Sequence, residues 1–212
     1  MKSQNISEDI YIIGAGGHGE VVLDVLFKNK IVPKGFLDDN KNLWDKEIFG
    51  IRVIGGINLA NELTGKFVVA IGDNNTRKQI VEFLKLSDQR YFTCIHPSVI
   101  LGNEVLIENG SMIMPGVVIN IKSKIGKHTI INTCSSIDHH NVIGDFVHIA
   151  PGVHTGGNVE IGEGTLIGIG ATILPNIKIG NWSVIGAGSI VTRNVPDNVV
   201  VVGVPAKIIK RR

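Results

Sequence analysis

The chain of 212 residues has little cysteine, few aromatic side chains and almost no excess of charge of one sign. Its two cysteines, Cys94 and Cys134, are too few for a disulfide framework, which favours a reduced, cytoplasmic setting. A formal net charge of +2 gives no reason to expect binding to nucleic acid or to an anionic membrane. No apolar run reaches the roughly 18 residues of a membrane-spanning helix, and the polar start lacks a signal-peptide core. We therefore expect a cytoplasmic protein without membrane insertion.

Glycine and aliphatic residues are abundant instead, with 26 glycines and 43% hydrophobic residues against 5% aromatics. From Leu101 onward an apolar residue occupies every sixth position, with Thr155 as the one exception. The series is Leu101, Ile107, Ile113, Ile119, Ile125, Ile131, Ile137, Ile143, Ile149, Ile161, Ile167, Ile173, Ile179, Ile185 and Val191. A period of six matches neither an α-helix nor a single strand. It is typical of a parallel β-helix, in which each hexad forms one short strand and one turn.

Three such hexads close one triangular coil, so residues 18 apart should stack on one another. One ladder is expected to contain Ile125, Ile143, Ile161 and Ile179. A second is expected to contain Ile131, Ile149, Ile167 and Ile185. A single coil buries almost nothing, whereas a stack of coils buries a continuous aliphatic column.

The first 95 residues follow a different pattern. Buried-strand patterns cover 9–14, 32–39 and 67–72, and helical patterns cover 20–30 and 79–86. Strands that alternate with helices indicate a small parallel α/β domain of Rossmann-like type. The sequence thus predicts an α/β domain over 1–95, which binds a nucleotide sugar, and an all-β parallel β-helix over 96–212 with a C-terminal tail.

A glycine-rich loop, Gly14-A-Gly16-G-H-Gly19, joins the first strand to the first helix, and Asp38 follows 19 residues after it. Such a loop lets the backbone approach a phosphate at a helix N-terminus. Three interpretations compete: a dinucleotide site, a tight turn without a ligand, and a mononucleotide site. A full dinucleotide site needs two halves, and this segment has room for one. We favour a nucleotide sugar, with Asp38 or Asp39 accepting hydrogen bonds from its base or ribose.

Several motifs occur in a fixed order: I-G-A-G-G-H-G, G-F-L-D-D, A-I-G-D-N-N-T-R-K, I-N-T-C-S-S-I-D-H-H, V-I-G-D-F-V-H-I-A-P-G and V-G-V-P-A-K. Together they resemble the sialic acid O-acetyltransferase NeuD family and its PglD-type N-acetyltransferases of nucleotide-linked amino sugars. The hexapeptide part resembles the left-handed β-helix of hexapeptide acyltransferases. The resemblance implies a left-handed β-helix, acetyl-CoA as co-substrate, and a homotrimer with sites between neighbouring subunits.

The resemblance also implies a role for His139, which should act as the general base that removes the proton of the attacking amine. Relatives usually carry Asp or Glu directly after this base, where the present chain has His140. His140 is therefore a possible orienter of the base. Asp138 and Asp145 are alternative sources of the missing carboxylate, and the sequence does not decide among the three.

Further site residues follow from the resemblance and from the glycine loop. The residues expected to bind the sugar substrate are Gly16, Gly17, His18, Asp38, Asp39, Gly72 and Asn132. Those expected to bind acetyl-CoA are His148, Gly157, Ile169 and Ala187, with Gly168 and Gly186 allowing close approach. The basic tail, with Lys207, Lys210, Arg211 and Arg212, either meets the CoA phosphates or is simply solvated.

The histidines do not form a metal site within one chain. His148 and His154 occupy the same slot in consecutive hexads, so they lie on adjacent faces of the triangle and point apart. One chain cannot bring both to a zinc ion at about 2.1 Å, and no metal is expected. Cys134 stands next to the small, inward Ser135, which favours packing over a role as nucleophile.

We therefore expect an acetyl-CoA-dependent N-acetyltransferase that acts on the 4-amino group of a nucleotide-activated amino-deoxy sugar, such as a UDP-, dTDP- or GDP-4-amino-4,6-dideoxyhexose. It would serve surface glycan biosynthesis, and the amine would attack the thioester directly. The alternative is O-acetylation of a sialic acid or another sugar. Two less favoured hypotheses are a zinc enzyme similar to the γ-class carbonic anhydrases and a nucleotide-sugar sensor without turnover.

Overall fold

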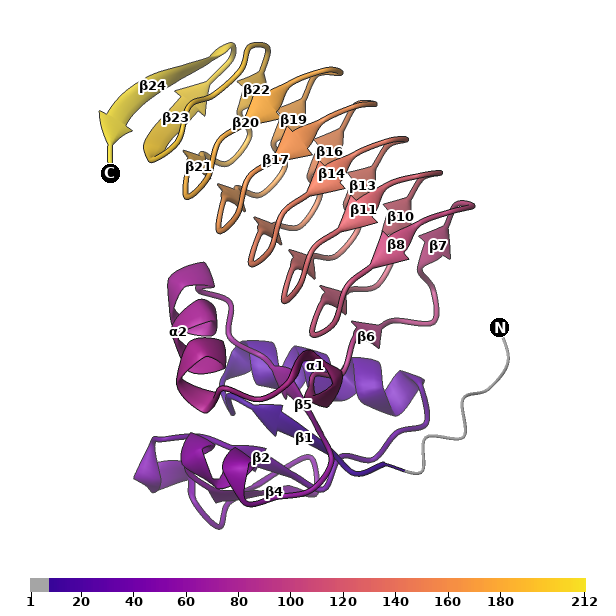
Figure 1. The fold of residues 1–212 in the computed structure, drawn as a ribbon, viewed down its shortest axis with the longest axis vertical. Helices are drawn as coiled ribbons and strands as arrows, with labels where there is room; N and C mark the ends of the chain where they lie inside the picture. The colour runs from indigo at the N-terminus through magenta and orange to yellow at the C-terminus, as the bar shows by residue number, and fades with distance from the viewer. Residues whose placement is uncertain (1–7) are drawn as a thin grey trace.

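The computed structural model describes residues 8–212, and an α/β domain lies at one end of a long stack of triangular coils (Figure 1). The α/β sheet has the order β3-β4-β2-β1-β5, and only the β3–β4 pair is antiparallel. Its strands are β1 (Ile10–Ile13), β2 (Gly35–Leu37), β3 (Glu47–Ile48), β4 (Ile51–Gly55) and β5 (Lys66–Val69). The sequence patterns predicted β1, β2 and β5. They missed the two-residue β3 and the five-residue β4, whose residues alternate between buried and more exposed positions.

Alternating side chains of β1 face opposite sides of this sheet, and both sides are covered. Ile10 and Ile12 pack with helix α1 (Gly17–Lys28), whereas Tyr11 and Ile13 pack with helix α2 (Asn74–Leu84). A strand covered on both faces reads as a continuous apolar run, which is how β1 was recognisable. The remaining helical turns are η1 (Lys41–Leu43), η2 (Ile57–Asn61) and η3 (Asp88–Arg90).

Helix α2 begins at Asn74, five residues earlier than the pattern over 79–86 predicted, and it ends at Leu84. The reason is the cap that precedes it, since Asp73 Oδ1 accepts a hydrogen bond of 2.8 Å from the backbone N–H of Thr76. A side-chain cap of this kind satisfies an amide that the first turn would otherwise leave unpaired. The polar first turn lacks apolar periodicity, so the sequence pattern did not reveal it.

The β-helix consists of three parallel sheets, one for each face of the triangle. The β6 sheet contains β6 (Cys94–Ile95), β9 (Met112–Ile113), β12 (Ile130–Ile131), β15 (His148–Ile149), β18 (Leu166–Ile167), β21 (Val184–Ile185), β23 (Val199–Gly203) and the antiparallel β24 (Ala206–Arg211). The β7 sheet contains β7 (Ile100–Leu101), β10 (Val118–Ile119), β13 (Ser136–Ile137), β16 (His154–Thr155), β19 (Thr172–Ile173) and β22 (Ile190–Val191). The β8 sheet contains β8 (Leu106–Ile107), β11 (Lys124–Ile125), β14 (Val142–Ile143), β17 (Glu160–Ile161) and β20 (Lys178–Ile179).

The register of these sheets confirms both predicted ladders. Ile125, Ile143, Ile161 and Ile179 pair in succession along the β8 sheet. The ladder that begins at Ile131 runs along the β6 sheet in the same way. The second residue of most strands points inward and is buried, which produces one aliphatic column along the stack. Below, the turns that join the sheets are called the β6/β7, β7/β8 and β8/β6 corners.

The α/β domain docks on the first coils of the stack. Helix α1 is held between its own sheet and the β6 sheet, where Val22 and Leu26 belong to the same buried cluster as Met112 and Ile130. The boundary expected between residues 95 and 96 falls directly after β6, whose strand already pairs with β9. Within the described range 8–212, no helix is long and apolar enough to span a bilayer.

Candidate functional site

The carboxyl ends of β1 and β5 lie side by side, and the chain order of the sheet reverses between them. A parallel sheet offers its ligand crevice at such a switch point. The glycine loop follows β1 here, and a Cβ at Gly19 would collide with the backbone carbonyl of Gly14. A Cβ at Gly16 or Gly17, by contrast, would meet open space. Packing therefore explains Gly19 and leaves Gly16 and Gly17 open to the crevice.

The two acids after β2 differ in how far they are already engaged. Asp38 accepts hydrogen bonds of 2.8 Å from the backbone amides of Ala15 and Asn40, one on each carboxylate oxygen. Asp38 thereby fixes the glycine loop to the end of β2. Asp39 is exposed and accepts a hydrogen bond of 2.9 Å from the amide of Ile57 through Oδ1. Asp39 thus has the more accessible carboxylate of the two.

His18 stands in the glycine loop and faces the β-helix, with its ring 6.5 Å from the ring of His148. Burial, together with the positive charge of Arg77, lowers the pKa of His18 to about 4. Its Nε2 is buried and has no hydrogen-bond partner among the described residues. Such an atom is costly in a closed core, whereas a polar ligand can satisfy it.

His148 joins the two domains through both of its ring nitrogens. Nδ1 lies 3.1 Å from the carbonyl oxygen of Gly72, which can only accept, so Nδ1 carries the proton. Burial and, secondarily, the charge of Arg77 lower the pKa of His148 to about 4, so the ring is neutral at physiological pH. Nε2 then has a lone pair, which accepts a hydrogen bond of 3.2 Å from the amide of Asn132. Gly72 therefore determines the tautomer of His148.

His139 and His140 lie on the β7/β8 corner. Their Nδ1 atoms are 3.1 Å apart, so one ring donates a hydrogen bond to the other. The ring of His139 covers Gly157 of the next coil so closely that any side chain at Gly157 would displace it. Gly157 thus maintains the position of the His139 imidazole.

The two carboxylates considered as partners of His139 are engaged elsewhere. Asp138 Oδ1 accepts hydrogen bonds from the backbone amide of His139 at 2.8 Å and from the side chain of Asn120 at 3.0 Å. Asp145 lies on the β8/β6 corner and accepts a hydrogen bond of 2.7 Å from the amide of Lys127. His140 is therefore the side chain that contacts the His139 ring.

One chain brings together only part of the expected site. Gly72, His18, Asn132 and His148 gather at the crevice, whereas His139 lies at a different corner of the triangle. Two of the residues expected at acetyl-CoA, Ile169 and Ala187, are exposed on the β6/β7 corner, in the turns that follow β18 and β21. The basic tail forms the exposed β24 strand at the far end of the stack.

The sequence analysis missed Arg77, which is fully buried in the junction between the domains. Its guanidinium donates to the carbonyl oxygens of His128 at 2.8 Å and Phe146 at 2.9 Å on the β8/β6 corner. It also donates to the carbonyls of Ile71 at 2.7 Å and Gly72 at 3.3 Å. Arg77 therefore anchors the loop whose carbonyl binds His148. The motif D-N-N-T-R-K contained this arginine, but a charged residue in a helix is usually solvated.

The sequence analysis assigned no role to His128 either. Its side chain is buried between the ring of Tyr91 and the parallel ring of Phe146, and burial lowers its pKa to about 4. The expectation that Cys134 is packed is wrong, since this residue is exposed on the β6/β7 corner. It occupies a left-handed turn position, which turns the residue away from the column.

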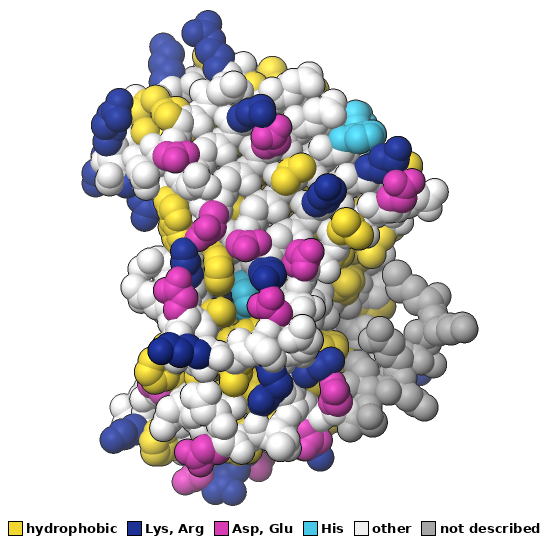
Figure 2. All heavy atoms as spheres, in the orientation of Figure 1, with side chains coloured by type: hydrophobic (Ala, Val, Ile, Leu, Met, Phe, Trp, Pro, Cys, Tyr) yellow, Lys and Arg dark blue, Asp and Glu magenta, His cyan; other side chains and the backbone are white. Residues whose placement is uncertain are grey.

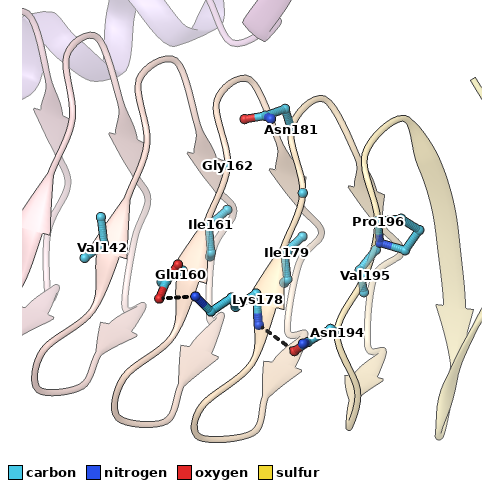
Figure 3. A pocket seen from close by; sticks show the side chains of 11 residues that line it. Val142, Glu160, Ile161, Gly162, Lys178, Ile179, Asn181, Asn194, Val195 and Pro196 are labelled. Atoms are coloured by element: carbon cyan, nitrogen blue, oxygen red, sulfur yellow. Dashed lines mark hydrogen bonds and ion pairs between the residues drawn. The ribbon is translucent and has the colours of Figure 1, made fainter.

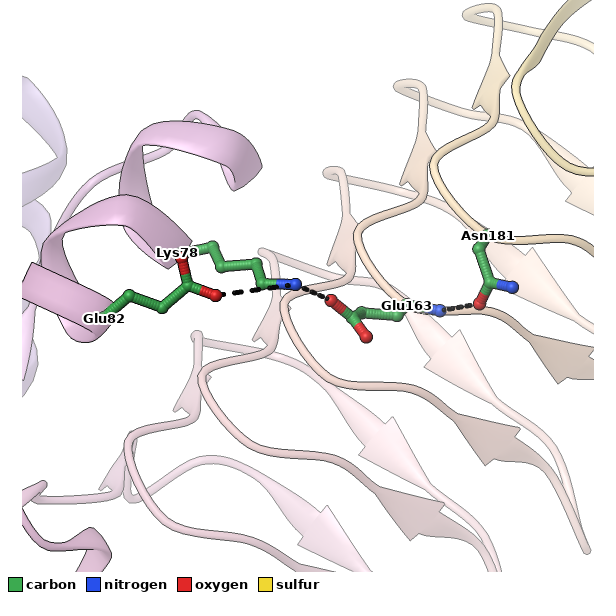
Figure 4. Close-up of polar contacts among 4 residues, drawn as sticks. All are labelled: Lys78, Glu82, Glu163 and Asn181. Atoms are coloured by element: carbon green, nitrogen blue, oxygen red, sulfur yellow. Dashed lines mark hydrogen bonds and ion pairs between the residues drawn. The ribbon is translucent and has the colours of Figure 1, made fainter. Parts of the chain in front are cut away.

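Charged side chains of both signs surround the junction between the domains (Figure 2). Lys78 of α2 lies between Glu82 of the same helix and Glu163 of the β-helix, and it forms an ion pair with each of them (Figure 4). Lys127 and Asp88 form a second ion pair across the junction at 2.6 Å. Among residues 8–212, no group of three or more His, Cys, Asp or Glu side chains is placed to hold a metal ion.

Comparison with known families gives two matches on this chain. Residues 9–84 match the PglD N-terminal domain, and residues 158–193 match the bacterial transferase hexapeptide with six repeats. GDP-perosamine N-acetyltransferase of Escherichia coli O157:H7 is 30% identical over 170 residues, which cover 76% of each chain. UDP-N-acetylbacillosamine N-acetyltransferase of Bacillus subtilis is 37% identical over 115 residues, which cover 50% of this chain and 51% of that protein.

Two solved structures are similar over nearly the whole chain. A mutant of GDP-perosamine N-acetyl transferase from Caulobacter crescentus, in complex with CoA and GDP-perosamine, superimposes with a TM-score of 0.88 at 33% identity, covering 95% of this chain and 97% of that one. The acetyltransferase domain of PglB from Neisseria gonorrhoeae, in complex with acetyl coenzyme A, gives a TM-score of 0.87 at 33% identity, covering 95% and 99%.

Proposed function

The chain belongs to the family of nucleotide-sugar N-acetyltransferases that join a PglD-type N-terminal domain to hexapeptide repeats, and we propose that it acetylates the 4-amino group of a nucleotide-activated amino-deoxy sugar. It is an acyltransferase, and acetyl-CoA is its co-substrate. The observation that carries the choice of acceptor is the similarity, over 95% of the chain, to an enzyme bound to CoA and GDP-perosamine. The product would serve surface glycan assembly.

The acceptor binds in the crevice at the end of β1 and β5. Open space at Gly16 and Gly17 admits the phosphates to the N-terminus of α1, whose unpaired amides favour an anion. Asp39 accepts hydrogen bonds from the ribose or base through its accessible carboxylate oxygen, and Asp38 keeps the loop in shape. The buried Nε2 of His18 gains a partner from the bound sugar nucleotide. Residues 1–95 thus serve as the domain for this substrate.

His139 is the general base of the reaction. The contact between the two Nδ1 atoms leaves Nε2 of His139 with a lone pair when His139 donates and His140 accepts. Nε2 then takes the proton of the amine as the nitrogen forms its bond to the thioester carbonyl carbon. The tetrahedral oxyanion is stabilised by a backbone N–H, and it collapses as CoA leaves as the thiol, which takes its proton from the His139 imidazolium. His140 is a positioning residue, because it selects the tautomer of the base.

The arrangement of the residues supports a homotrimer. His139 lies on the β7/β8 corner, whereas Asn132, Ile169 and Ala187 lie on the β6/β7 corner. If the β7 sheets of three chains face a common axis, each β7/β8 corner meets the β6/β7 corner of its neighbour. The base of one subunit then faces the acetyl-CoA groove and crevice of the next.

The β7 sheet is suited to this contact by its composition. Its outward residues are Ile100, Val118, Ser136, His154, Thr172 and Ile190, so within these described strands the face carries no Asp, Glu, Lys or Arg. Ile100 and Val118 are 63% and 36% exposed. The β8 sheet differs, since Glu160 and Lys178 point outward from it and form an ion pair of 2.9 Å (Figure 3). Depletion of charge is typical of the centre of a subunit interface.

Replacing His139 with Ala tests the proposal. Loss of a general base lowers turnover by roughly 10²- to 10⁴-fold, whereas the affinity for acetyl-CoA should change little. Thiol release from acetyl-CoA is followed with a panel of nucleotide amino sugars, and acetyl-CoA affinity is measured by calorimetry. His96→Ala serves as the control, because His96 contacts Ser98 away from the crevice. A loss of less than threefold in His139→Ala would remove it as the base.

A further inference from the structure

A hollow of about 390 Å³ lies beside helix α1, between the α/β domain and the β6/β7 corner of the β-helix. Its lining is largely apolar and includes Val21, Phe27, Phe49 and Pro115. Phe49 is 74% exposed, Val21 42% and Phe27 37%, so large apolar side chains are open to solvent here. A cluster of this kind on one side of a domain is typical of an interaction surface.

Two carboxylates, Glu20 and Asp24, also line this hollow. Both are exposed, and neither forms an ion pair with any residue in the described part of the chain, 8–212. An occupant should therefore combine an apolar group with a positive charge. Gly17, which the bound phosphates would approach, also lines this hollow at its glycine-loop end, whereas Glu20 and Asp24 would repel an anion placed further along α1.

The proposed trimer determines which part of a neighbouring chain reaches this surface. In the shared site, the partner's His139 approaches the corner that carries Asn132. One coil earlier on both chains, 18 residues back, the partner's Ile121 comes opposite Met114 and Pro115. Pro115 lines the hollow, so the partner's corner of this coil lies at its opening.

This corner has the chemistry that the hollow requires. Ile121 is half-exposed although it is aliphatic, and Lys122 is exposed in a left-handed turn position. Lys122 forms no ion pair with the described residues of its own chain. The hollow beside α1 and the Ile121–Lys122 corner thus carry opposite charges, and both expose apolar groups.

We propose that the hollow beside α1 receives the Ile121–Lys122 corner of a second copy of this chain, with the partner's Lys122 facing Glu20 and Asp24. The proposal rests on the shared site described above. The contact would also serve the reaction. The α/β domain that holds the sugar nucleotide is anchored to the β-helix that supplies the base, so the distance between the amine and the partner's His139 is fixed.

Inter-chain cross-linking tests this contact directly. A short bismaleimide is used, because a lysine that reaches a carboxylate keeps the two Cβ atoms farther apart than the roughly 3.5–4.5 Å of a disulfide. Asp24→Cys and Lys122→Cys are combined in a Cys134→Ser background, which removes the exposed native thiol. The cross-linker should join up to three chains on a denaturing gel, and neither single variant should be joined. Asp24→Cys combined with Lys178→Cys is the matched control, because Lys178 points outward from the β8 sheet. Glu20→Cys replaces Asp24→Cys in a second series.

Charge reversal gives a measurement that does not depend on cross-linking. Lys122→Glu should raise the concentration at which the trimer dissociates by about tenfold, because three copies of a modest ion pair are lost. Lys122→Glu combined with Asp24→Lys should restore the native value in sedimentation experiments. Failure of both the cross-link and the restoration, in variants that remain trimeric and active, overturns this contact and leaves the acetyltransferase assignment intact. An active monomer would instead overturn the shared site together with this contact.

Discussion

Arg77 offers the sharpest test of how the two domains are held together. Its side chain is fully buried, and burial lowers the pKa of its guanidinium to about 9. It donates hydrogen bonds to carbonyls on both sides of the junction, and also to the side chain of Asn74 at 2.9 Å. We expect Arg77→Met, which keeps much of the side-chain volume, to destabilise the protein strongly.

The magnitude follows from the acceptors that the substitution leaves behind. The carbonyl oxygens of His128 and Phe146 lose a charged donor inside the junction, and each buried acceptor without a partner costs about 1–3 kcal/mol. Removing the buried guanidinium also removes its own desolvation cost, which offsets part of this loss. We therefore expect the free energy of unfolding to fall by about 3 kcal/mol, a large share of the roughly 5–15 kcal/mol typical of a domain.

Urea unfolding, followed by far-ultraviolet circular dichroism, measures this change. Lys78→Met is the matched control, because Lys78 is the next residue of α2 and also links the domains, but through a partly exposed ion pair. Such pairs contribute roughly 0–1 kcal/mol. If Arg77→Met and Lys78→Met destabilise the protein equally, buried hydrogen bonds of Arg77 do not hold the junction. Arg77→Met should also lower turnover, because the Gly72 carbonyl that orients His148 loses its anchor.

Further expectations concern the acids, the glycine beneath the base and the buried histidines. Asp39→Ala should raise the KM for the sugar nucleotide while the KM for acetyl-CoA stays constant. Asp38→Ala should have the same effect on KM and should also lower the melting temperature, because it releases the glycine loop. Equal effects on the KM of both substrates would contradict the assignment of these acids to the sugar nucleotide. Gly157→Ala should lower kcat with little loss of stability, because its methyl group displaces the base; unchanged kcat would refute this. His18, His128 and His148 have pKa values lowered to about 4, whereas an unfolded histidine titrates near 6.5. The unfolded state therefore binds more protons between these values, so the free energy of unfolding should fall as the pH decreases from about 6.5 to 4, by at most roughly 3 kcal/mol per histidine. Chemical unfolding at a series of pH values measures this, and His128→Asn should remove one part of the dependence.

The β-helix was predictable because its rule is local and repeated. One aliphatic residue in every six enters the column, and its spacing alone assigns Ile125 and Ile143 to the same ladder. The first β-strand was equally clear, since a strand covered on both faces is apolar throughout. Strand β3 was missed because it has only two residues, and β4 was missed because its residues alternate between buried and more exposed positions instead of forming a continuous apolar run. The start of α2 was missed because a polar cap, rather than an apolar face, defines it.

The candidate site, like the fold, was predictable only in part from the sequence. The sequence named His139, His148 and Asn132, whose side-chain chemistry is independent of the fold, and it also named Gly72. Only the tertiary structure brings Gly72, 76 residues away in the chain, against His148 and thereby selects its tautomer. The position of His139 on a different corner is likewise a property of the coil geometry.

The sequence by itself therefore determined the coils and the order of the domains, because each depends on residues close together in the chain. The tertiary structure decided which of these residues meet. Arg77 could be assigned to the junction only from the tertiary structure, because its burial depends on carbonyl groups 51 and 69 residues further along the chain. A buried charge of this kind is tolerated only where the fold supplies its acceptors, and no local pattern encodes where those acceptors will be.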